Sequence, residues 1–325
     1  MPEQSRPQQR RRGRFLRGLA AFVVLCAVAG YLVVQYITGG TGDPGCKVVS
    51  GRDDGVAYEF TPEQAVNAAA ITAVGTGRGL PERAVAIALA TALQESGLRN
   101  ITHGDRDSLG LFQQRPSQGW GTEKQIMDPT YAAGAFYEHL VKIDGYTKLP
   151  LTVAAQRVQR SGYPEAYAKH EPDATVLAAA LTGTSAATLT CEGRPAATLA
   201  AGPEGVREAL VRDFGGDALD TTAKEVGAAA ATPAPEATVS GRTVTVPVSG
   251  GKGSKDGKGR STRERGWQLA HWAVANASAL HLQSVTYAGR QWTAGNTQSE
   301  WRTTSSEGAG GAEGAAGSVR ILTAQ

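Results

Sequence analysis

The sequence predicts a mainly α-helical protein: a helical domain that follows an N-terminal transmembrane helix, with a small α+β module at the carboxyl terminus. Three observations support this fold class. Residues 18–37 form an almost uninterrupted apolar run, residues 61–182 contain a succession of helix starts, and residues 242–248 alternate between apolar and polar side chains as a strand does. Stretches rich in glycine and alanine separate these parts, so the packed portion is smaller than 325 residues.

The apolar run Gly18–Ile37 has the length that spans a bilayer as a helix. Six Arg and one Glu give residues 1–17 a charge of +5, which leaves −2 for the rest of a chain whose net charge is +3. Such a tail stays in the cytoplasm, which places everything after the span outside. The alternative is a cleaved signal peptide, but no good small-x-small cleavage site follows the run.

We therefore expect a single-pass protein of the cell membrane, held there by its N-terminal helix, with its bulk outside the cytoplasm. The nearly neutral remainder argues against a nucleic-acid partner, because binding to phosphates needs clustered positive charge on the folded part. The remaining boundaries follow composition. They are a basic cytoplasmic tail over 1–17, a transmembrane helix over 18–37, linkers over 38–60 and 183–204, a helical domain over 61–182 and the α+β module over 205–325.

Two of the three cysteines flank the predicted helical domain. Cys26 lies inside the apolar run, whereas Cys46 and Cys191 both lie in the part predicted to be outside. Disulfides form and persist in such an oxidising compartment, where an unpaired thiol is a liability. The sequence therefore predicts a Cys46–Cys191 disulfide.

Helix signals recur along the predicted domain. Thr61-Pro62 with Gln64 is typical of a capping box, and Pro81 begins a helix that is apolar on almost every face and ends at Glu95, before Gly97. Residues 98–125 lack helical periodicity, which predicts a loop with a short hairpin. Further helices are predicted from Pro129, over 151–159, from Pro164 until Pro172 breaks it, and over 174–181. In the module, helices are predicted over 204–214 and 267–282, and strands over 242–248, 283–292 and 319–322.

One short constellation carries a resemblance. Glu95-Ser96 stands at a helix end, and Gly110-Leu111-Phe112-Gln113 follows about 15 residues on. This arrangement resembles the lysozyme-like superfamily, in particular the soluble lytic transglycosylases, over roughly residues 61–181. The resemblance implies a lysozyme-like helical domain that acts on the glycan strands of peptidoglycan. Glu95 would protonate the glycosidic oxygen and then act as base toward the C6 hydroxyl of the sugar. A general acid of this kind works best beside dry, apolar surroundings.

Several polar and aromatic residues are candidates for contact with the glycan. A second carboxylate, best placed at Asp107, would serve a hydrolase, although Gly104–Ser108 is also ordinary turn chemistry. Side-chain amides in this region could form hydrogen bonds with the sugars, and aromatic rings could stack on them. No cofactor and no metal site is expected, since the five histidines lack metal-ligand spacing. The candidate substrate-binding residues are Asp107, Ser108, Gln113, Gln114, Trp120 and Tyr163.

The sequence leaves the function open between two classes. The first is an enzyme that cuts peptidoglycan strands, of lytic transglycosylase or muramidase type. The second is an inactive scaffold protein of the same kind that binds peptidoglycan, since Gln159–Tyr163 stands where the transglycosylases often carry Tyr-Asn-Ala-Gly. The α+β module shows no chemical motif, and its tryptophans at 267, 272, 292 and 301 favour a small core over a ligand site. A protein partner for this module is a further expectation.

Overall fold

The computed structural model describes residues 45–52, 54–161, 163, 165–193, 202–215, 235–248, 260–295, 300–304 and 317–324. All of them belong to one compact unit, Pro44–Gln325. The transmembrane helix expected at residues 18–37 lies outside the described residues. Within the described ranges, no helix is both long enough and apolar enough to cross a membrane.

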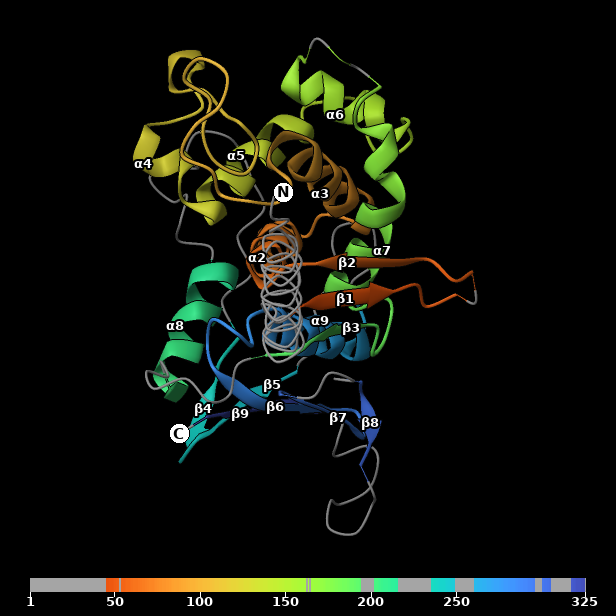
Figure 1. Cartoon of the computed structure of the whole chain (residues 1–325), viewed down its shortest axis with the longest axis vertical. Coiled ribbons are helices and arrows are strands. Elements are labelled where there is room, and N and C mark those ends of the chain that lie inside the picture. The colour runs from red at the N-terminus through yellow and green to blue at the C-terminus, as the bar shows by residue number, and fades with distance from the viewer. Residues whose placement is uncertain are drawn as a thin grey trace, which may run out of the picture. The chain divides into compact units, whose positions relative to one another are not determined.

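The prediction of a mainly α-helical fold is wrong, because the described residues form an α+β structure with two antiparallel sheets (Figure 1). The smaller sheet has the order β2-β1-β3, from Ala57–Phe60, Cys46–Val49 and Leu189–Cys191. Its strands have three or four residues and fall in the predicted linkers. Strands this short carry too little periodicity to be recognised.

The larger sheet is built from the predicted carboxyl-terminal module. Its six strands follow the order β4-β5-β9-β6-β7-β8, and every neighbouring pair is antiparallel. Four of them, β5, β6, β7 and β9, overlap the three strands that were predicted, since the range 283–292 covers both β6 and β7. The strands are β4 Thr238–Ser240, β5 Thr243–Pro247, β6 Leu282–Tyr287, β7 Arg290–Thr293, β8 Arg302–Thr303 and β9 Ser318–Thr323.

Helices account for most of the other described residues. Helix α2 begins at the predicted capping box, where Thr61 Oγ1 accepts from the Gln64 amide and Gln64 Oε1 accepts from the Thr61 amide. Pro172 was expected to break a helix. It lies instead in the first turn of α7, where its missing N–H removes no intrahelical bond. The helices are α2 Pro62–Gly77, α3 Glu82–Ser96, α4 Glu123–Ile126, α5 Pro129–Leu140, α6 Leu151–Gln159, α7 Glu171–Thr182, α8 Gly202–Phe214 and α9 Thr262–Ala275, with 3₁₀ turns η1 Pro116–Gln118 and η2 Ala168–His170.

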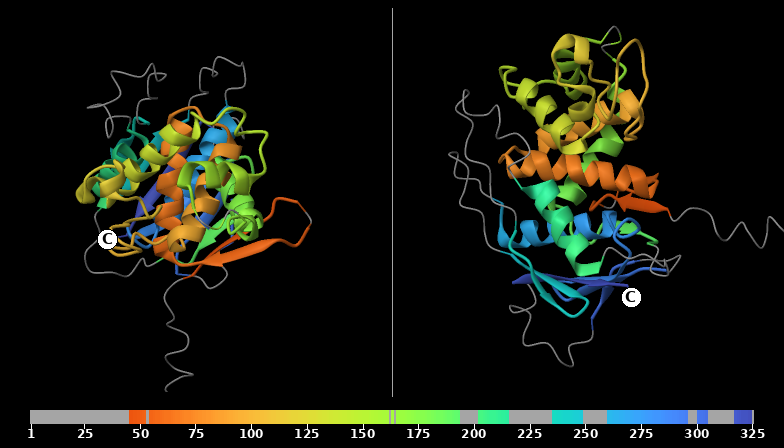
Figure 2. Two further views of the ribbon diagram at one scale, coloured as in Figure 1. Left: turned by 90° about the horizontal axis from the view of Figure 1, so that it is seen from above. Right: turned by 90° about the vertical axis from the view of Figure 1, so that its left-hand side faces the viewer.

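Helix α3 is the central element around the site. Residues 84–93 are all buried, and α2, α5, α6 and α7 pack around them (Figures 1 and 2). The alanine-rich sequence allows this because small side chains let neighbouring helices approach from every side. The helix ends where Gly97 adopts a left-handed conformation with φ 63°. Glu95 therefore stands on the last turn of a rigid helix.

Helix α9 joins the larger sheet to these helices. It lies on one face of the sheet and packs against α7 and α2 (Figure 2). Trp292 Nε1 donates to Cys191 O at 3.0 Å and Trp301 Nε1 donates to Leu189 O at 2.9 Å, which ties the sheet to β3. The four tryptophans at 267, 272, 292 and 301 are buried, so their prediction as core residues is confirmed. One continuous hydrophobic core results.

The predicted disulfide is confirmed. Cys46 on β1 and Cys191 on β3 are directly opposite each other in register, and their sulfur atoms are bonded. The bridge joins residues 145 positions apart in the sequence. It closes the chain around α2 to α7.

Candidate functional site

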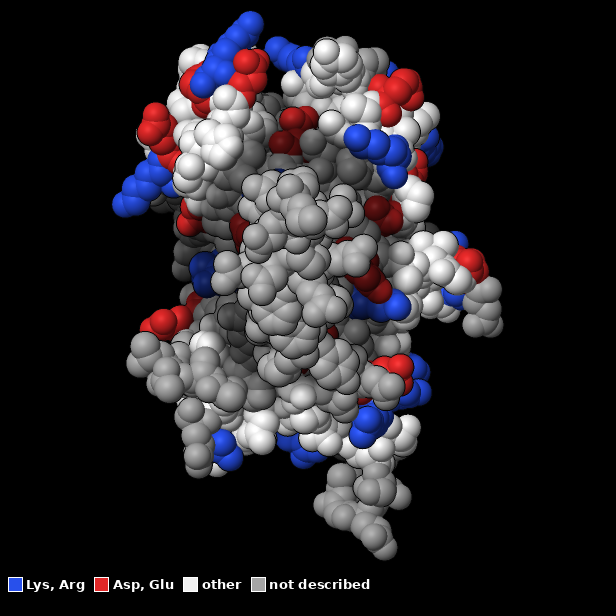
Figure 3. Space-filling model, in the orientation of Figure 1, with Lys and Arg blue, Asp and Glu red and all other residues white. Residues whose placement is uncertain are grey.

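A cleft with a volume of about 1050 Å³ lies at the end of α3. It is lined by Glu95, by loop residues within 105–120, by residues 139–143 at the end of α5 and by residues 157–161 at the end of α6. In Figure 3 the molecule is hollowed between the loop that carries α4 and the helix α6, with acidic atoms inside the hollow and basic side chains around it. A cleft of this volume accommodates more than one sugar unit.

Glu95 is held in place by a tyrosine from far along the chain. Tyr167 Oη donates to Glu95 Oε1 at 2.7 Å. Tyr167 is fully buried, whereas Glu95 is partly exposed to the cleft. Burial, reinforced by the charge of Glu95 and by this hydrogen bond, raises the pKa of Tyr167 far above its usual range. The phenol therefore keeps its proton and orients the carboxylate.

Ser96 connects the catalytic candidate to the Gly-Leu-Phe-Gln segment. Its Oγ donates to Leu111 O at 2.8 Å, with Ala92 O as a second acceptor at 3.1 Å. The next carbonyl of the segment, Phe112 O, accepts from Gln159 Nε2 at 2.8 Å. The segment is thus attached to the ends of both α3 and α6. The Phe112 ring is buried and stacks on Phe136, with ring centroids 4.7 Å apart.

Gln113 lies at the cleft in an uncommon backbone conformation, with φ 48°. Its Nε2 lies 3.3 Å from Gly110 O and 3.4 Å from His103 O, both as acceptors. A Cβ at Gly104 would stand 1.7 Å from Gln113 Oε1 and 2.9 Å from Ser108 O, so this close approach requires a glycine. Gln113 lines the cleft and is partly exposed.

Gln114 borders the same cleft but is only 1% exposed. Its backbone pairs with Leu109 in the short hairpin, as predicted, and its Nε2 donates to Ala132 O at 3.0 Å. Ser108, which also borders the cleft, is buried in this hairpin. Gln114 thus attaches the loop to α5, whereas the Ser108 amide donates to Asp105 O within the loop.

Two rings form an aromatic part of the lining. Trp120 and His139 contact each other with ring centroids 4.2 Å apart and an interplanar angle of 37°. Both residues line the cleft. Apolar ring faces beside hydrogen-bonding groups are typical of pockets that take a polar ligand with an apolar face, such as a sugar.

Two of the predicted substrate-binding residues are not among those that line the cleft. Asp107 accepts from Arg115 Nε at 2.6 Å and from the Ser117 amide at 2.9 Å. The bonds from Ser117 and then from Arg115 hold the pKa of Asp107 well below its usual range. Tyr163 is 78% exposed and also lies outside the lining. The carboxylates that do line the cleft are Glu95 and Asp105, the latter with a side chain that is 93% exposed.

Sequence reasoning missed two supports of the site. Tyr167 lies 72 residues from Glu95, and Gln159 lies 47 residues from Phe112. No local sequence pattern predicts these two hydrogen-bonded pairs, because both depend on how α3, α6 and η2 pack together. Within the described ranges, no group of three or more His, Cys, Asp or Glu side chains could hold a metal ion.

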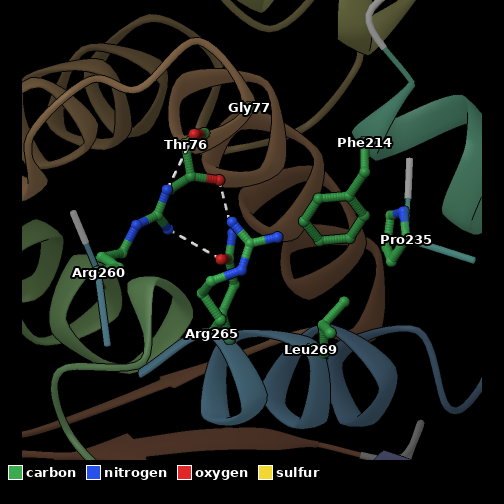
Figure 4. A pocket seen from close by; sticks show the side chains of 8 residues that line it. Thr76, Gly77, Phe214, Pro235, Arg260, Arg265 and Leu269 are labelled. Carbon is green, nitrogen blue, oxygen red and sulfur yellow. Dashed lines mark hydrogen bonds between the residues drawn. The ribbon is translucent and has the colours of Figure 1, made fainter. Parts of the chain in front are cut away.

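A second pocket lies between α2, α8 and α9 (Figure 4). Its volume is about 30 Å³, which suits a water molecule and not a sugar. Arg260 Nη2 donates to Thr76 O at 2.9 Å and Nη1 donates to Gln268 Oε1 at 2.8 Å. Burial and the neighbouring Arg265 lower the pKa of Arg260 to about 10. These bonds fasten α9 to the end of α2.

Comparison with known proteins gives a family match in the carboxyl-terminal part of the chain. No curated protein matches this chain. A family described as VldE, C-terminal domain, matches residues 205–313, which is less than half of the chain. The matched range includes most of α8, all of α9 and five of the six strands of the larger sheet. It contains none of the residues that line the cleft.

Proposed function

We propose that this protein cuts the glycan strands of peptidoglycan, with Glu95 as general acid and then as general base. The observation that carries the proposal is the placement of the Glu95 carboxyl beside a cleft of about 1050 Å³, under a 2.7 Å hydrogen bond from Tyr167. The resemblance of Glu95-Ser96 and Gly110–Gln113 to the lytic transglycosylases supplies the substrate class.

The chemistry needs only one carboxyl. Protonated Glu95 gives its proton to the glycosidic oxygen as the bond from that oxygen to C1 breaks. The Glu95 carboxylate then takes the proton of the C6 hydroxyl of the same sugar, whose oxygen bonds to C1 and closes an anhydro ring. Tyr167 donates to the carboxylate between these steps and keeps it aimed into the cleft. Gln113 and the Trp120–His139 pair would hold the sugars.

The position of Asp107 favours this anhydro-forming route over a two-carboxylate hydrolysis. Both of its oxygens already accept hydrogen bonds, from Arg115 and from the Ser117 amide. A nucleophilic or stabilising carboxylate has to face the sugar ring. Asp105, the other carboxylate of the lining, is highly exposed and lies 4.0 Å from Arg106.

The Cys46–Cys191 disulfide supports a location outside the cytoplasm, because disulfides form and persist in oxidising compartments. That is the compartment in which peptidoglycan is found. A protein partner for the carboxyl-terminal part remains part of the proposal, since that part lies away from the cleft.

The test is Glu95→Gln, which keeps the size of the side chain but cannot deliver a proton. Cleavage of purified wall should fall at least ~10²-fold while wall binding is retained. Glu63→Gln, at an exposed glutamate in the first turn of α2, is the matched control and should cut like the parent. Mass analysis of the fragments identifies the route, since an anhydro end and a reducing end differ by one water. If the parent binds wall but never cuts it, the scaffold function replaces this proposal.

A further inference from the structure

We propose that a cationic rim of the cleft, formed by Lys142, Arg157 and Arg160, binds the carboxylates of the peptide stems that branch from the glycan strand. The charged side chains that line the cleft define this rim. The identification of its ligand rests on the proposed function. The site would therefore select strands that carry acidic stems over bare glycan.

The lining of the cleft has an excess of positive charge. Five Lys or Arg side chains border it, against the two carboxylates Glu95 and Asp105. Arg115 is neutralised by Asp107, and Arg106 lies 4.0 Å from Asp105. Lys142, Arg157 and Arg160 are exposed, and among the described residues they form no ion pair. A concave surface with unpaired cations concentrates anionic ligands.

Arg160 is held in a conformation that suits glycine better. It caps α6 with φ 51° and ψ 36°, in the left-handed region. Its only backbone contribution there is an N–H that donates to Gln156 O at 2.7 Å, and a glycine would make the same bond. The backbone therefore gives no reason for an arginine, whereas a ligand in the cleft does.

All three cations stand at the carboxyl end of a helix, where positive charge interacts favourably with the helix dipole: Arg157 and Arg160 at the end of α6, and Lys142 directly after the C-cap Val141 of α5. This effect explains a cation at each helix end separately. It does not explain why both helix ends place their cations on the same cleft.

The rim is also fixed relative to the reacting group. Between Arg157 and Arg160, Gln159 donates to Phe112 O at 2.8 Å, and Ser96 donates to the adjacent Leu111 O. The end of α6 is thus linked through two hydrogen bonds to the residue beside Glu95. A stem bound on the rim would set which sugar of the strand lies at Glu95.

Binding is measured with the full chain carrying Glu95→Gln, so that no strand is cut. The probes are purified strands with stems, the same strands with their carboxyl groups amidated, and strands from which the stems have been removed. We expect Lys142→Gln/Arg157→Gln/Arg160→Gly to weaken binding of stem-bearing strands about tenfold, since each exposed charge contributes modestly. Binding of the amidated and stem-free strands should stay unchanged. Added salt should weaken the parent and not the triple variant.

Three control variants keep the outcome decisive. Arg160→Gly alone relaxes the backbone, so it should retain or raise the melting temperature while losing affinity, and Arg160→Lys should keep the affinity. Lys148→Gln removes an exposed cation that does not border the cleft and should bind like the parent. Equal affinity of the parent for stem-bearing and stem-free strands would overturn the proposal, and so would unchanged affinity of the triple variant. Competition by a phosphodiester wall polymer, without competition by free stem peptide, would also overturn it. Whether the parent cuts wall is a separate result that tests only the proposed function.

Discussion

Tyr167 Oη lies 2.7 Å from Glu95 Oε1, and the two residues are 72 positions apart in the sequence. Tyr167 is fully buried behind the cleft, whereas the carboxylate that it contacts reaches the lining. A phenol whose pKa is raised far above its usual range, chiefly by burial, can only donate to that carboxylate. This bond fixes the direction in which Glu95 presents its oxygens.

Tyr167→Phe removes this donor and keeps the ring. We expect kcat for wall cleavage to fall roughly tenfold to a hundredfold with little change in KM, because a hydrogen bond to a charged group contributes about 1.5–3 kcal/mol. Tyr137→Phe is the matched control. Its hydroxyl donates to Ile71 O at 3.1 Å in the core, so its loss should lower stability and leave kcat unchanged. Equal kcat values for the Tyr167 variant and the parent would remove the positioning role.

The disulfide gives a stability prediction. Replacing both Cys46 and Cys191 by alanine should lower the free energy of unfolding by about 2–5 kcal/mol, because the bridge closes a long loop and restricts the unfolded chain. The measurement is chemical denaturation with and without reductant. The parent should lose stability in reductant, and the double variant should not respond to it. A parent whose denaturation midpoint is the same in both conditions would contradict the prediction.

His271 gives a prediction for pH dependence. It is fully buried in α9, its Nδ1 contacts Ala180 O at 2.7 Å and its Nε2 accepts from the Thr188 amide at 3.3 Å. Burial lowers the pKa of His271 to about 4. In the unfolded chain the value is about 6.5, so between these limits the unfolded state binds a proton that the folded state excludes.

The free energy of unfolding should therefore fall as the pH drops from about 6.5 to about 4, by about 3 kcal/mol from this residue. Above pH 6.5 the residue makes no contribution to the slope. His271→Gln should be less stable at neutral pH and should lack this part of the slope, measured by denaturant titration at several pH values. Burial also lowers the pKa of His170, so the difference between parent and variant is the quantity to compare. Parallel curves would contradict the prediction.

The sequence predicts local features of this fold well and distant ones poorly. The capping box at Thr61 and the Asp128-Pro129 start of α5 are present, because capping depends on residues within one turn. The position of Glu95 at the end of a buried helix also follows from local pattern. The strands β1, β2 and β3 were missed, since each is too short to show alternation, and β1 and β3 pair although they lie far apart in the sequence.

The same limit applies within the site. Asp107 was predicted as a substrate-binding residue from its residue type. In the structure it accepts hydrogen bonds from Arg115 and from the Ser117 amide, and these partners depend on how the loop turns around η1. Tyr167 lies 72 residues from Glu95 in the sequence, and its hydrogen bond to Glu95 depends on the contact between η2 and α3. Patterns over a few residues cannot encode such contacts.

Asp107→Asn separates the two enzymatic routes. We expect this variant to keep substantial cleavage, because the Asp107 carboxylate is occupied by Arg115 and by the Ser117 amide and is not among the groups that line the cleft. The hydrogen bonds from Ser117 and Arg115 lower the pKa of Asp107, so it stays ionised throughout the working range and the pH profile of cleavage should not change. The variant should instead loosen the loop, which hydrogen exchange at residues 115–118 would detect as faster exchange.

Asp105→Asn is the control for a carboxylate that does border the cleft. Under the anhydro-forming route both aspartate variants should release fragments with anhydro ends, and only Glu95→Gln should stop cleavage. A hydrolase would behave differently, because its second carboxylate must act on the sugar or on the attacking water. If Asp107→Asn abolished cleavage as fully as Glu95→Gln, and the parent released reducing ends, the loop around η1 would have to rearrange on binding and a two-carboxylate mechanism would replace the one proposed.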